Sequence, residues 1–404
     1  MYDLIIIGGG PAGIFAAISA KEKKTDIKIL VLEKSQKLLH KVLISGGGRC
    51  NVTNGLLNPM DLDPKDLARN YPRGQKELLG PFHQFGPKET IGWFEKNSVK
   101  LKKEEDGRIF PQSNSSATIV DSLLLRAKLL NIEILKNQDI EKVYKENESF
   151  KVSTKDKTFI AKKLAITTGS STKGFEIAKD LGHTIKKPIP SLFGFNISKF
   201  TLKDLSGIAL LVELKIEGSK FSQKGDMLIT HFGFSGPAIL TLSSFAARYL
   251  FDKSYKAELI VNWLFDLSED EIFKKLIDLK NTKSQKTLYS ENLFHLPKNL
   301  WFAFLDFFDE TFTKQLKDLP KKDLLILSKK LSSDSYTING KTTNKKEFVT
   351  CGGITLKEVN FKTMESKICE NLFFAGEILD IDGVTGGFNF QNAWTTAYIL
   401  GQSI

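Results

Sequence analysis

The sequence of 404 residues predicts an α/β fold, and three observations support this class. An apolar strand pattern at residues 2–7 runs into a glycine-rich turn and a helical stretch, and a second apolar run, Ile27 to Leu32, follows. Strand patterns dominate residues 191–262, and helical patterns dominate residues 265–334. An apolar segment at 371–377 then precedes a last helical pattern. We therefore expect a sheet domain built on a βαβ unit, interrupted by a strand-rich part and a helical part.

The first 33 residues have the order and spacing of a dinucleotide-binding unit. Gly8 permits the tight turn after the strand, Gly10 lets backbone amides approach phosphate oxygens, and Gly13 allows the helix to pack closely on the sheet. The helix N-terminus then faces the negative charge of a pyrophosphate. Glu33 stands 20 residues after Gly13, at the end of the second strand, where a carboxylate can accept hydrogen bonds from ribose hydroxyls.

Composition indicates an ordinary globular protein of two or three domains, with 41% hydrophobic and 26% charged residues. The first strand pattern begins at residue 2 or 3, and no apolar run is long enough to span a bilayer. We therefore expect a cytoplasmic protein with no signal peptide and no membrane partner. Cys50, Cys351 and Cys369 form no C-x-x-C pair, which predicts reduced thiols, no disulfide framework and no metal site.

The net charge of +11 raises the question of a nucleic-acid partner. Only 6 of the 58 basic residues are arginine, and the lysines are scattered along the chain. Because arginine is preferred for bidentate phosphate and base contacts, a dispersed lysine excess is more typical of a solvated surface. The charge pattern therefore argues against nucleic-acid binding.

Helical and strand patterns alternate between residues 56 and 190. The segments 131–135, 142–145, 150–154 and 158–160 read as short strands of a meander, and the following run, 164–169, reads as a buried strand. Later strand patterns are 193–197, 209–216, 228–229, 257–261, 336–338 and 348–351, with a helical hairpin around 238–250.

The segment 265–334 has the signals of three helices. Ser268 and Glu271 form a capping box, and Pro297 and Pro320 suit the first turns of two further helices. Apolar residues follow each signal at helical spacing, so we interpret the aromatic residues here as the core of a small helical insert rather than as a cofactor site.

A second glycine-rich loop, Ser45 to Asn51, places three glycines before Arg49 and Cys50. Such a loop exposes successive backbone amides, a nest for an anion or for the polar edge of a ring, and Arg49 can neutralise a phosphate or a carboxylate. Its place soon after Glu33 predicts that it lies beside the bound dinucleotide. A flexible turn without a ligand is the alternative.

The C-terminal segment carries a third set of candidate residues. An apolar strand ends in Ala375-Gly376-Glu377, which places a carboxylate at the sheet edge where open α/β sheets bind ligands. Ten residues after Glu377, Gly387 opens a helix whose N-terminal dipole can stabilise negative charge on a bound ring. A solvated loop acid is the alternative for Glu377.

These strings resemble a known family. Ser45 to Asn54, Thr230 to Pro237 and Gly376 to Asn389 resemble the BaiN/YhiN-like NAD(P)/FAD-dependent oxidoreductases, some of which are labelled aminoacetone oxidase-like. The N-terminal fingerprint, the strand end at Thr168-Gly169 and Phe374 to Glu377 are similar to glutathione-reductase-type flavoproteins. Where relatives tend to read Ala-Thr-Gly-Gly, this chain has Thr-Thr-Gly-Ser at 167–170.

The resemblance implies a glutathione-reductase-type FAD-binding Rossmann domain at 1–190 and 352–404, a β-barrel-like insert at 191–264 and 335–351, and a nested small helical subdomain at 265–334. It implies FAD as the cofactor and NAD(P)H as a diffusible electron donor. The donor follows from the resemblance alone, because no second G-x-G-x-x-G marks a nicotinamide domain. The implied cofactor-binding residues are Gly8, Gly10, Pro11, Ala12, Gly13, Glu33, Lys34, Lys41, Gly46, Gly47, Gly48, Arg49, Cys50, Asn51, Ile140, Thr168, Gly169, Gly376, Glu377, Gly387, Phe388 and Asn389.

No residue is marked by the sequence as the catalytic acid or base, and the candidates are Arg49 and His231. His231 precedes a glycine loop and can exchange a proton near neutral pH, with a hydrogen-bonded loop histidine as the alternative. Arg108 can anchor an anionic substrate or form a surface ion pair. For Cys50, a flavin adduct or an inert buried thiol are the two interpretations, and the lack of a partner cysteine favours the second.

We expect a FAD-dependent oxidoreductase that passes a hydride or two electrons, from NAD(P)H, through bound flavin to a small-molecule acceptor. The missing cysteine pair argues against disulfide reduction. The alternatives are an RNA-associated flavoprotein and a FAD-binding protein without turnover. The sequence does not indicate the acceptor, the nicotinamide preference, the use of dioxygen or the oligomeric state.

Overall fold

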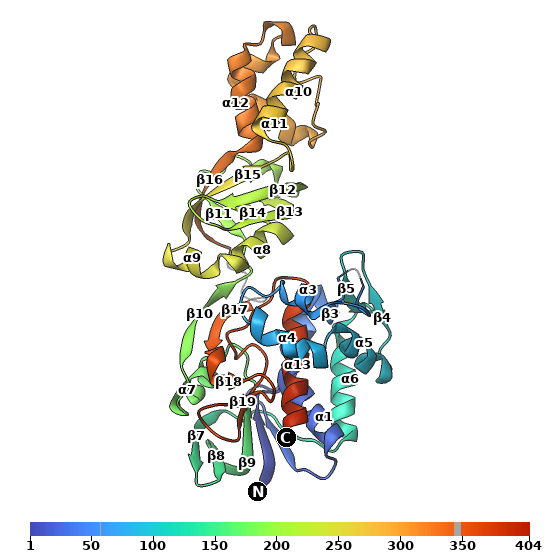
Figure 1. Cartoon of the computed structure of the whole chain (residues 1–404), viewed down its shortest axis with the longest axis vertical. Helices are drawn as coiled ribbons and strands as arrows, with labels where there is room; N and C mark the ends of the chain where they lie inside the picture. Colours follow the sequence, from blue (N-terminus) through green and yellow to red (C-terminus); the bar gives the residue numbers. More distant parts are fainter. Residues whose placement is uncertain (57, 343–348) are drawn as a thin grey trace. The chain divides into compact units, whose positions relative to one another are not determined.

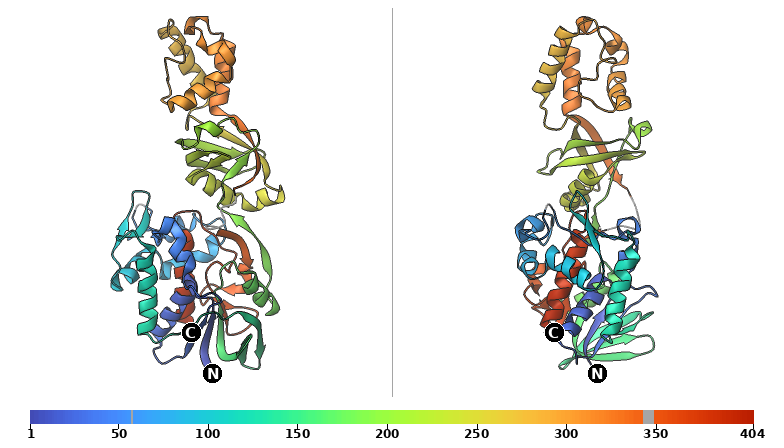
Figure 2. Two further views of the ribbon diagram at one scale, coloured as in Figure 1. Left: turned by 180° about the vertical axis from the view of Figure 1, so that it is seen from behind. Right: turned by 90° about the vertical axis from the view of Figure 1, so that its right-hand side faces the viewer.

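The computed structural model describes residues 1–56, 58–342 and 349–404, and the chain forms two compact units. The first unit comprises Met1–Pro190 and Lys345–Ile404, and the second comprises Ser191–Asn344. Figure 1 and Figure 2 show the elements of each unit, coloured along the chain from blue to red.

A mixed sheet of nine strands forms the centre of the first unit, within the described residues. Its strands lie in the order β18-β19-β20-β9-β1-β2-β6, and β8 and β7 continue from β9 as an antiparallel extension. The strands are β1 Tyr2–Ile7, β2 Ile29–Leu32, β6 Glu133–Leu135, β7 Ile140–Glu146, β8 Ser149–Thr154, β9 Thr158–Ile166, β18 Val359–Asn360, β19 Glu365–Ser366 and β20 Leu372–Phe374.

The middle of this sheet is parallel: β20 pairs with β9, β9 with β1, β1 with β2, and β2 with β6. Leu4, Ile5 and Ile6 of β1 are fully buried, and so are Leu30 and Val31 of β2. A continuous apolar run of this kind is typical of a parallel strand that is covered on both faces. The predicted βαβ unit is therefore confirmed as β1-α1-β2.

Two predictions for the strands that follow need correction. The runs 158–160 and 164–169 are not two strands, because β9 spans Thr158–Ile166 without a break. Its first half pairs antiparallel with β8, and its second half pairs parallel with β1 and β20. The segment 131–135 is not part of the meander either, since β6 pairs parallel with β2.

Helices and short strands of the first unit surround this sheet. They are α1 Pro11–Lys23, α2 His40–Ile44, β3 Thr53–Asn54, α3 Pro64–Ala68, α4 Gln75–Gln84, α5 Pro87–Lys96, β4 Leu101–Lys103, β5 Arg108–Pro111, α6 Ser116–Leu129, α7 Thr172–Asp180, β10 Ile185–Ser191, β17 Val349–Ile354 and α13 Phe388–Ser403. Of the predicted strand 348–351, Phe348 lies outside the described residues.

Helices α1 and α13 lie side by side, although their sequences are far apart (Figure 1 and Figure 2). Close approach is possible at Gly401 of α13, where an added Cβ would lie 2.5 Å from the Cβ of Ser19 in α1. Phe15 and Trp394 add an edge-on ring contact with centroids 5.5 Å apart. The last helix of the described chain is thus fixed against the first one.

The second unit contains a closed barrel of six antiparallel strands, in the order β11-β14-β13-β12-β15-β16. The pairs of β11 with β14 and of β11 with β16 close the barrel. The predicted barrel-like insert is therefore confirmed as a closed antiparallel barrel. Its strands are β11 Phe195–Ile197, β12 Ala209–Ile216, β13 Ser222–Thr230, β14 Gly233–Ser235, β15 Lys256–Asn262 and β16 Asp334–Lys341.

The chain leaves the barrel after β15, forms a group of helices and returns as β16 (Figure 1). These helices are α10 Glu269–Thr282, α11 Lys298–Asp306 and α12 Lys321–Ser332; two others, α8 Pro237–Phe245 and α9 Ala247–Asp252, follow β14. The predicted capping box is present: Ser268 and Glu271 satisfy each other's backbone amides at the start of α10. Trp263 and Trp301 are almost fully buried in the apolar core that joins these helices to the barrel.

Candidate functional site

Parallel strands bring their carboxyl ends to one edge of a sheet, and the first unit places its candidate residues there. Gly8 follows β1, Glu33 follows β2, Thr167 follows β9, and Gly376 and Glu377 follow β20. Four segments that are distant in the sequence therefore meet at the edge where ligands of open α/β sheets bind.

The turn between β1 and α1 has the backbone that a bound phosphate requires. Gly8 has φ +112°, in the region that favours glycine, and a Cβ at Gly13 would lie 1.9 Å from the carbonyl oxygen of Gly8. By contrast, nothing lies within 4 Å of a Cβ built at Gly10, the N-cap of α1. The helix is thus pressed onto the strand at Gly13 while its N-terminus, with Pro11 in the first turn, stays open.

Glu33 is held in place by three hydrogen bonds. Its Oε2 accepts from the amide of Gly9 at 2.7 Å, and its Oε1 accepts from the amide and the hydroxyl of Ser35 at 2.8 and 2.7 Å. The amide of Gln138 donates to the carbonyl of Glu33, so the segment before Ile140, a buried residue of β7, lies next to this acid. Lys34 instead points to the surface, where it pairs with Asp139 at 3.3 Å.

The glycine loop after α2 is a tight turn with left-handed backbone. Gly46, Gly47 and Gly48 have φ of +55°, +65° and +84°, and nothing lies within 4 Å of a Cβ at Gly47 or Gly48. The loop therefore exposes backbone with no side chains in the way, as a nest requires.

The two side chains that follow this loop are already occupied in packing. Arg49 donates to Glu104 at 2.7 Å, and its guanidinium lies 4.1 Å from the ring centroid of Phe110. Cys50 is fully buried, and burial raises the pKa of its thiol to about 12. A buried, protonated thiol agrees with the interpretation of Cys50 as inert.

Asn51 is the most informative side chain of the loop. It is 8% exposed, and its Oδ1 has no hydrogen-bond partner in the described part of the chain. This oxygen lies 2.7 Å from the position of a Cβ at Gly387, which is the N-cap of the 16-residue helix α13 and has φ +98°. A buried polar atom without a partner costs about 1–3 kcal/mol, so this oxygen, beside the N-terminus of α13, points to a ligand.

Glu377 has two partners, a lysine ammonium group and a backbone amide. It forms an ion pair with Lys41, and its Oε1 accepts from the amide of Thr350 at 3.0 Å. Gly169, with φ +58°, lies against this pair, since a Cβ there would be 3.5 Å from Oε2 of Glu377. The sequence-predicted residues Lys41, Gly169 and Glu377 are therefore brought together.

Several other predicted residues use their side chains for structure rather than for an open site. Thr168 packs against Gly174 of α7, and its buried Oγ1 has no described partner. Asn389 bonds to the amide and the carbonyl of Gly383 at 2.9 Å each, and the carbonyl of Phe388 accepts from Tyr71. The side chain of Asn389 and the carbonyl of Phe388 therefore have partners within the fold, whereas Oγ1 of Thr168 has none among the described residues.

His231 belongs to the second unit, where it is exposed in the turn between β13 and β14. Arg108 forms ion pairs with Asp106 at 2.6 Å and with Glu104 at 3.4 Å, as expected for the surface alternative. Neither side chain is among the groups that the sheet edge assembles.

Sequence reasoning missed the contacts that fix the loop between β20 and α13. Asp382 is fully buried and pairs with Arg73, and Asp380, 1% exposed, pairs with Lys186 at 2.7 Å. The only signal in the sequence was the pair of acids inside the apolar run of residues 378–384. Within the described ranges, no group of three or more His, Cys, Asp and Glu side chains could hold a metal ion.

The described residues also contain no helix with the length and apolar character needed to cross a bilayer. The open N-terminus of α1, the fixed carboxylate of Glu33 and the unpartnered oxygen of Asn51 fit a flavin dinucleotide that extends along the carboxyl edge of the sheet. Fold and site together define a Rossmann-type flavin-dependent oxidoreductase.

The chain belongs to the HI0933-like family, since the HI0933-like protein Rossmann domain matches residues 2–403. This confirms the resemblance found in the sequence and the expected fold class, and the family is one of FAD-binding Rossmann proteins, which implies FAD as the cofactor.

Two curated relatives match along the whole chain. A ribosomal RNA dihydrouridine synthase of Escherichia coli is 29% identical over 415 residues, covering 100% of this chain and 98% of that protein. A 3-dehydro-bile acid delta(4,6)-reductase of Clostridium scindens is 27% identical over 424 residues, covering 100% and 99%. Both names describe oxidoreductases, so the expectation of an enzyme is confirmed.

Solved structures share the fold. The 3-ketosteroid-delta4-(5alpha)-dehydrogenase of Rhodococcus jostii RHA1 has a TM-score of 0.53 at 13% identity, covering 99% of this chain and 96% of that chain. The 3-ketosteroid delta1-dehydrogenase of Sterolibacterium denitrificans has a TM-score of 0.52 at 12% identity, with 99% and 98% covered.

Proposed function

We propose that this protein is a FAD-dependent reductase of a carbon–carbon double bond that is conjugated to a carbonyl group, and that its substrate is a uridine base in ribosomal RNA. The observation that carries this proposal is the similarity to ribosomal RNA dihydrouridine synthases, 29% in Escherichia coli and 28% in Haemophilus influenzae, over nearly the whole length of each protein.

The named activities of the relatives share one type of bond. In uracil, the double bond that is lost on forming dihydrouridine is conjugated to a ring carbonyl, and in a 3-oxo steroid the delta-4 and delta-6 double bonds are conjugated to the 3-oxo group. Each reduction adds a hydride to the far carbon of the conjugated system and a proton to a carbon nearer the carbonyl. With NADH or NADPH as the proposed donor, one nicotinamide is oxidised and one proton is consumed for each bond reduced. Bound FAD would supply the two-electron transfer between donor and acceptor.

The chain's own residues would hold the cofactor and exclude water from it. We propose that the open N-terminus of α1 faces the pyrophosphate and that Glu33 accepts from ribose hydroxyls. The N-terminus of α13 would donate to the polar edge of the flavin ring, where donors stabilise negative charge, and Oδ1 of Asn51 would accept from an N–H of that edge. The ion pair of Lys41 and Glu377 would border the cofactor beside Gly169.

Charge supports an RNA substrate over a neutral one. The chain has 58 basic and 47 acidic residues, and most of the excess belongs to the first unit, with 37 basic and 29 acidic residues against 21 and 18 in the second. The scatter of the lysines argued against RNA at the level of sequence, but a positive excess on the unit with the cofactor site suits attraction of a polyanion. Together with the ribosomal RNA relatives, this charge makes RNA the leading substrate.

The test uses the purified yellow protein and ribosomal RNA from a strain in which the gene is deleted. We expect that anaerobic incubation with NADH or NADPH converts uridine to a nucleoside heavier by two hydrogens, measured by mass spectrometry of digested RNA. Binding of the RNA should weaken steeply as salt rises. Reduced protein that leaves this RNA unchanged, at low salt and with either nicotinamide, would reject RNA as the substrate.

A small-molecule enone is the second candidate substrate, supported by the relative that acts on a bile acid. Anaerobically reduced protein can be mixed with a 3-oxo-4,6-diene steroid and the return of flavin absorbance followed. Reoxidation by the steroid but not by RNA would favour this candidate. No flavin bleaching by either nicotinamide would instead favour a FAD-binding protein without turnover.

A further inference from the structure

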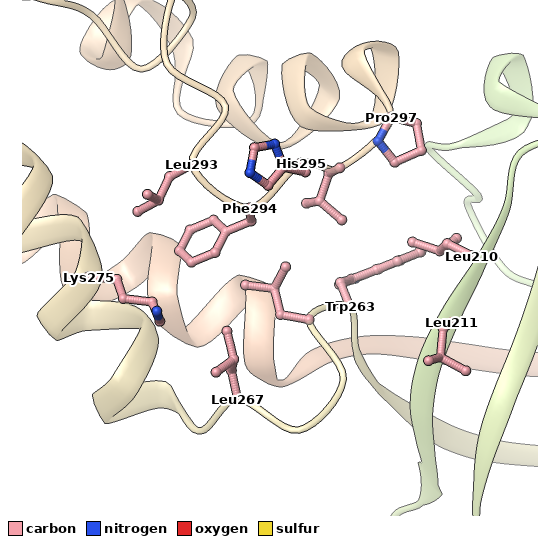
Figure 3. Close-up of a pocket in the computed structure, with 11 residues that line it drawn as sticks. Leu210, Leu211, Trp263, Leu267, Lys275, Leu293, Phe294, His295 and Pro297 are labelled. Atoms are coloured by element: carbon pink, nitrogen blue, oxygen red, sulfur yellow. The ribbon is translucent and has the colours of Figure 1, made fainter.

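The second unit contains a cavity that the proposed function does not use. Its volume is about 400 Å³, and it lies between β12, the segment after β15, α10 and the loop before α11. Figure 3 shows its lining side chains turned toward a shared space: six leucines, one phenylalanine, one proline and Trp263 form the apolar wall, and Lys275 and His295 are the two exceptions. Small-molecule sites are typically apolar cavities of about 300–1,000 Å³ with a few placed polar groups.

The wall of the cavity is built by fixed side chains. Trp263 is 1% exposed, and its indole N–H donates to Asp334 at 3.0 Å. In the loop before α11, Asn292 bonds to both the carbonyl and the amide of Leu296, at 2.6 and 3.2 Å. This clasp holds His295 in the left-handed region, with φ +53°. A non-glycine residue in that region is uncommon, so the loop keeps an imidazole where glycine would be less strained.

The lining contains two basic side chains, Lys275 and His295, and no acidic side chain. Lys275 has no hydrogen bond or ion pair among the described contacts, although its charge helps to lower the pKa of Glu271. Glu271, one turn earlier on α10, is committed to the helix cap, where its carboxylate accepts from the amide and the hydroxyl of Ser268 at 2.8 and 2.6 Å. Those bonds from Ser268 lower the pKa of Glu271, which keeps it ionised at the cap.

We propose that this cavity binds a small carboxylic acid with an apolar body, its carboxylate facing Lys275 and His295. The leucine side chains of the wall offer no donors or acceptors, so they do not suit a nucleobase, whose edges need hydrogen bonds when buried. A neutral apolar ligand would contact the apolar wall but form no ion pair with the two basic side chains. An apolar anion satisfies both the wall and the charge.

The test uses the full-length holoprotein and 4-phenylbutyrate as the probe, with neutral 4-phenylbutanol as the matched ligand. We expect saturable binding of one 4-phenylbutyrate per chain in titration calorimetry. Lys275→Gln should weaken it at least threefold and leave 4-phenylbutanol unaffected, since the loss of a partly solvated charge pair is modest. Lys274→Gln is the control: Lys274 is exposed on α10, as Lys275 is, but does not line the cavity, and its change should leave affinity within about twofold.

Two substitutions in the wall locate the site independently. Leu293→Trp fills the cavity and should abolish binding of both probes. Leu211→Gln, at a side of the wall that is 47% exposed and tolerates a polar group, should weaken both. The proposal is overturned if the wild type shows no saturable binding at millimolar 4-phenylbutyrate, if Lys274→Gln and Lys275→Gln have equal effects, or if folded Leu293→Trp binds as the wild type does.

Discussion

The unpartnered side-chain oxygen of Asn51 permits a test in which stability and cofactor affinity change in opposite directions. Asn51→Leu keeps the approximate size of the side chain and removes its polar atoms. Because Oδ1 is buried without a described partner, cofactor-free protein should regain part of the cost of an unsatisfied group, about 1–3 kcal/mol. We expect an unchanged or higher free energy of unfolding for the cofactor-free variant.

The affinity for FAD should fall in the same variant. Without the Asn51 oxygen, a buried N–H of the ligand is left unsatisfied, which costs about 1–3 kcal/mol, so the dissociation constant should rise about fivefold to 150-fold. Urea unfolding of FAD-stripped protein gives the first quantity, and titration with FAD followed by flavin fluorescence gives the second.

Asn54 is the matched control, three residues further along the chain. It is 4% exposed, its Nδ2 donates to the carbonyl of Gly386 at 2.9 Å, and its Oδ1 accepts from Leu56 at 2.8 Å. Asn54→Leu should therefore lower the free energy of unfolding of the cofactor-free protein by about 2–4 kcal/mol. If Asn51→Leu destabilises the protein as Asn54→Leu does and binds FAD with wild-type affinity, Asn51 is a structural residue and the reasoning is refuted.

Three further predictions follow from burial and close contact. Gly13→Ala places a Cβ 1.9 Å from the Gly8 carbonyl oxygen, so it should lower the free energy of unfolding by about 1–3 kcal/mol and prevent FAD retention. Gly80→Ala, whose Cβ would have nothing within 4 Å, should have neither effect. Equal melting temperatures of the two variants would contradict this. Cys50, with a pKa of about 12, should resist iodoacetamide at pH 8 in the folded protein and react after unfolding, as peptide mass spectrometry can show; rapid labelling of native protein would argue against burial. Burial lowers the pKa of His183 below the ordinary 6.5 despite Glu358, so the unfolded chain takes up a proton first as the pH falls. The free energy of unfolding should therefore decrease as the pH drops below about 6.5. His183→Gln should lose that part of the pH dependence of the melting temperature, and a variant with the wild-type pH profile would exclude His183 as its source.

Local spacing predicted the parts of the fold that local chemistry controls. The turn at Gly8 to Gly13 and the acid at Glu33 predicted β1-α1-β2, and the capping box at Ser268 predicted the start of α10. The sequence also predicted which segments carry the cofactor residues, and the structure places Gly169 and Glu377 together, 208 residues apart in the chain. That these residues bind FAD stays a prediction.

Features that depend on distant partners could not be predicted. Strand β9 belongs to both the meander and the parallel sheet because its second half pairs with β1 and β20. No pattern within residues 158–166 indicates these distant pairing partners. The pair of Arg73 and Asp382 joins residues 309 positions apart, and neither has a neighbour that signals the other. The unpartnered oxygen of Asn51 is a property of its surroundings alone, since both the oxygen and the nitrogen of the nearby Asn54 side chain are hydrogen-bonded.

The first unit is made of two separate segments of the chain, so the order in which the ribosome synthesises them affects its folding. Strand β20 and helix α13 emerge only after the entire second unit, Ser191–Asn344, has been synthesised. The second unit is continuous and has all its barrel strands before translation reaches residue 345, whereas the opening βαβ segment must wait for its C-terminal partners. A nascent chain stalled before α13 would therefore carry all six barrel strands but lack the C-terminal segment of the proposed FAD site.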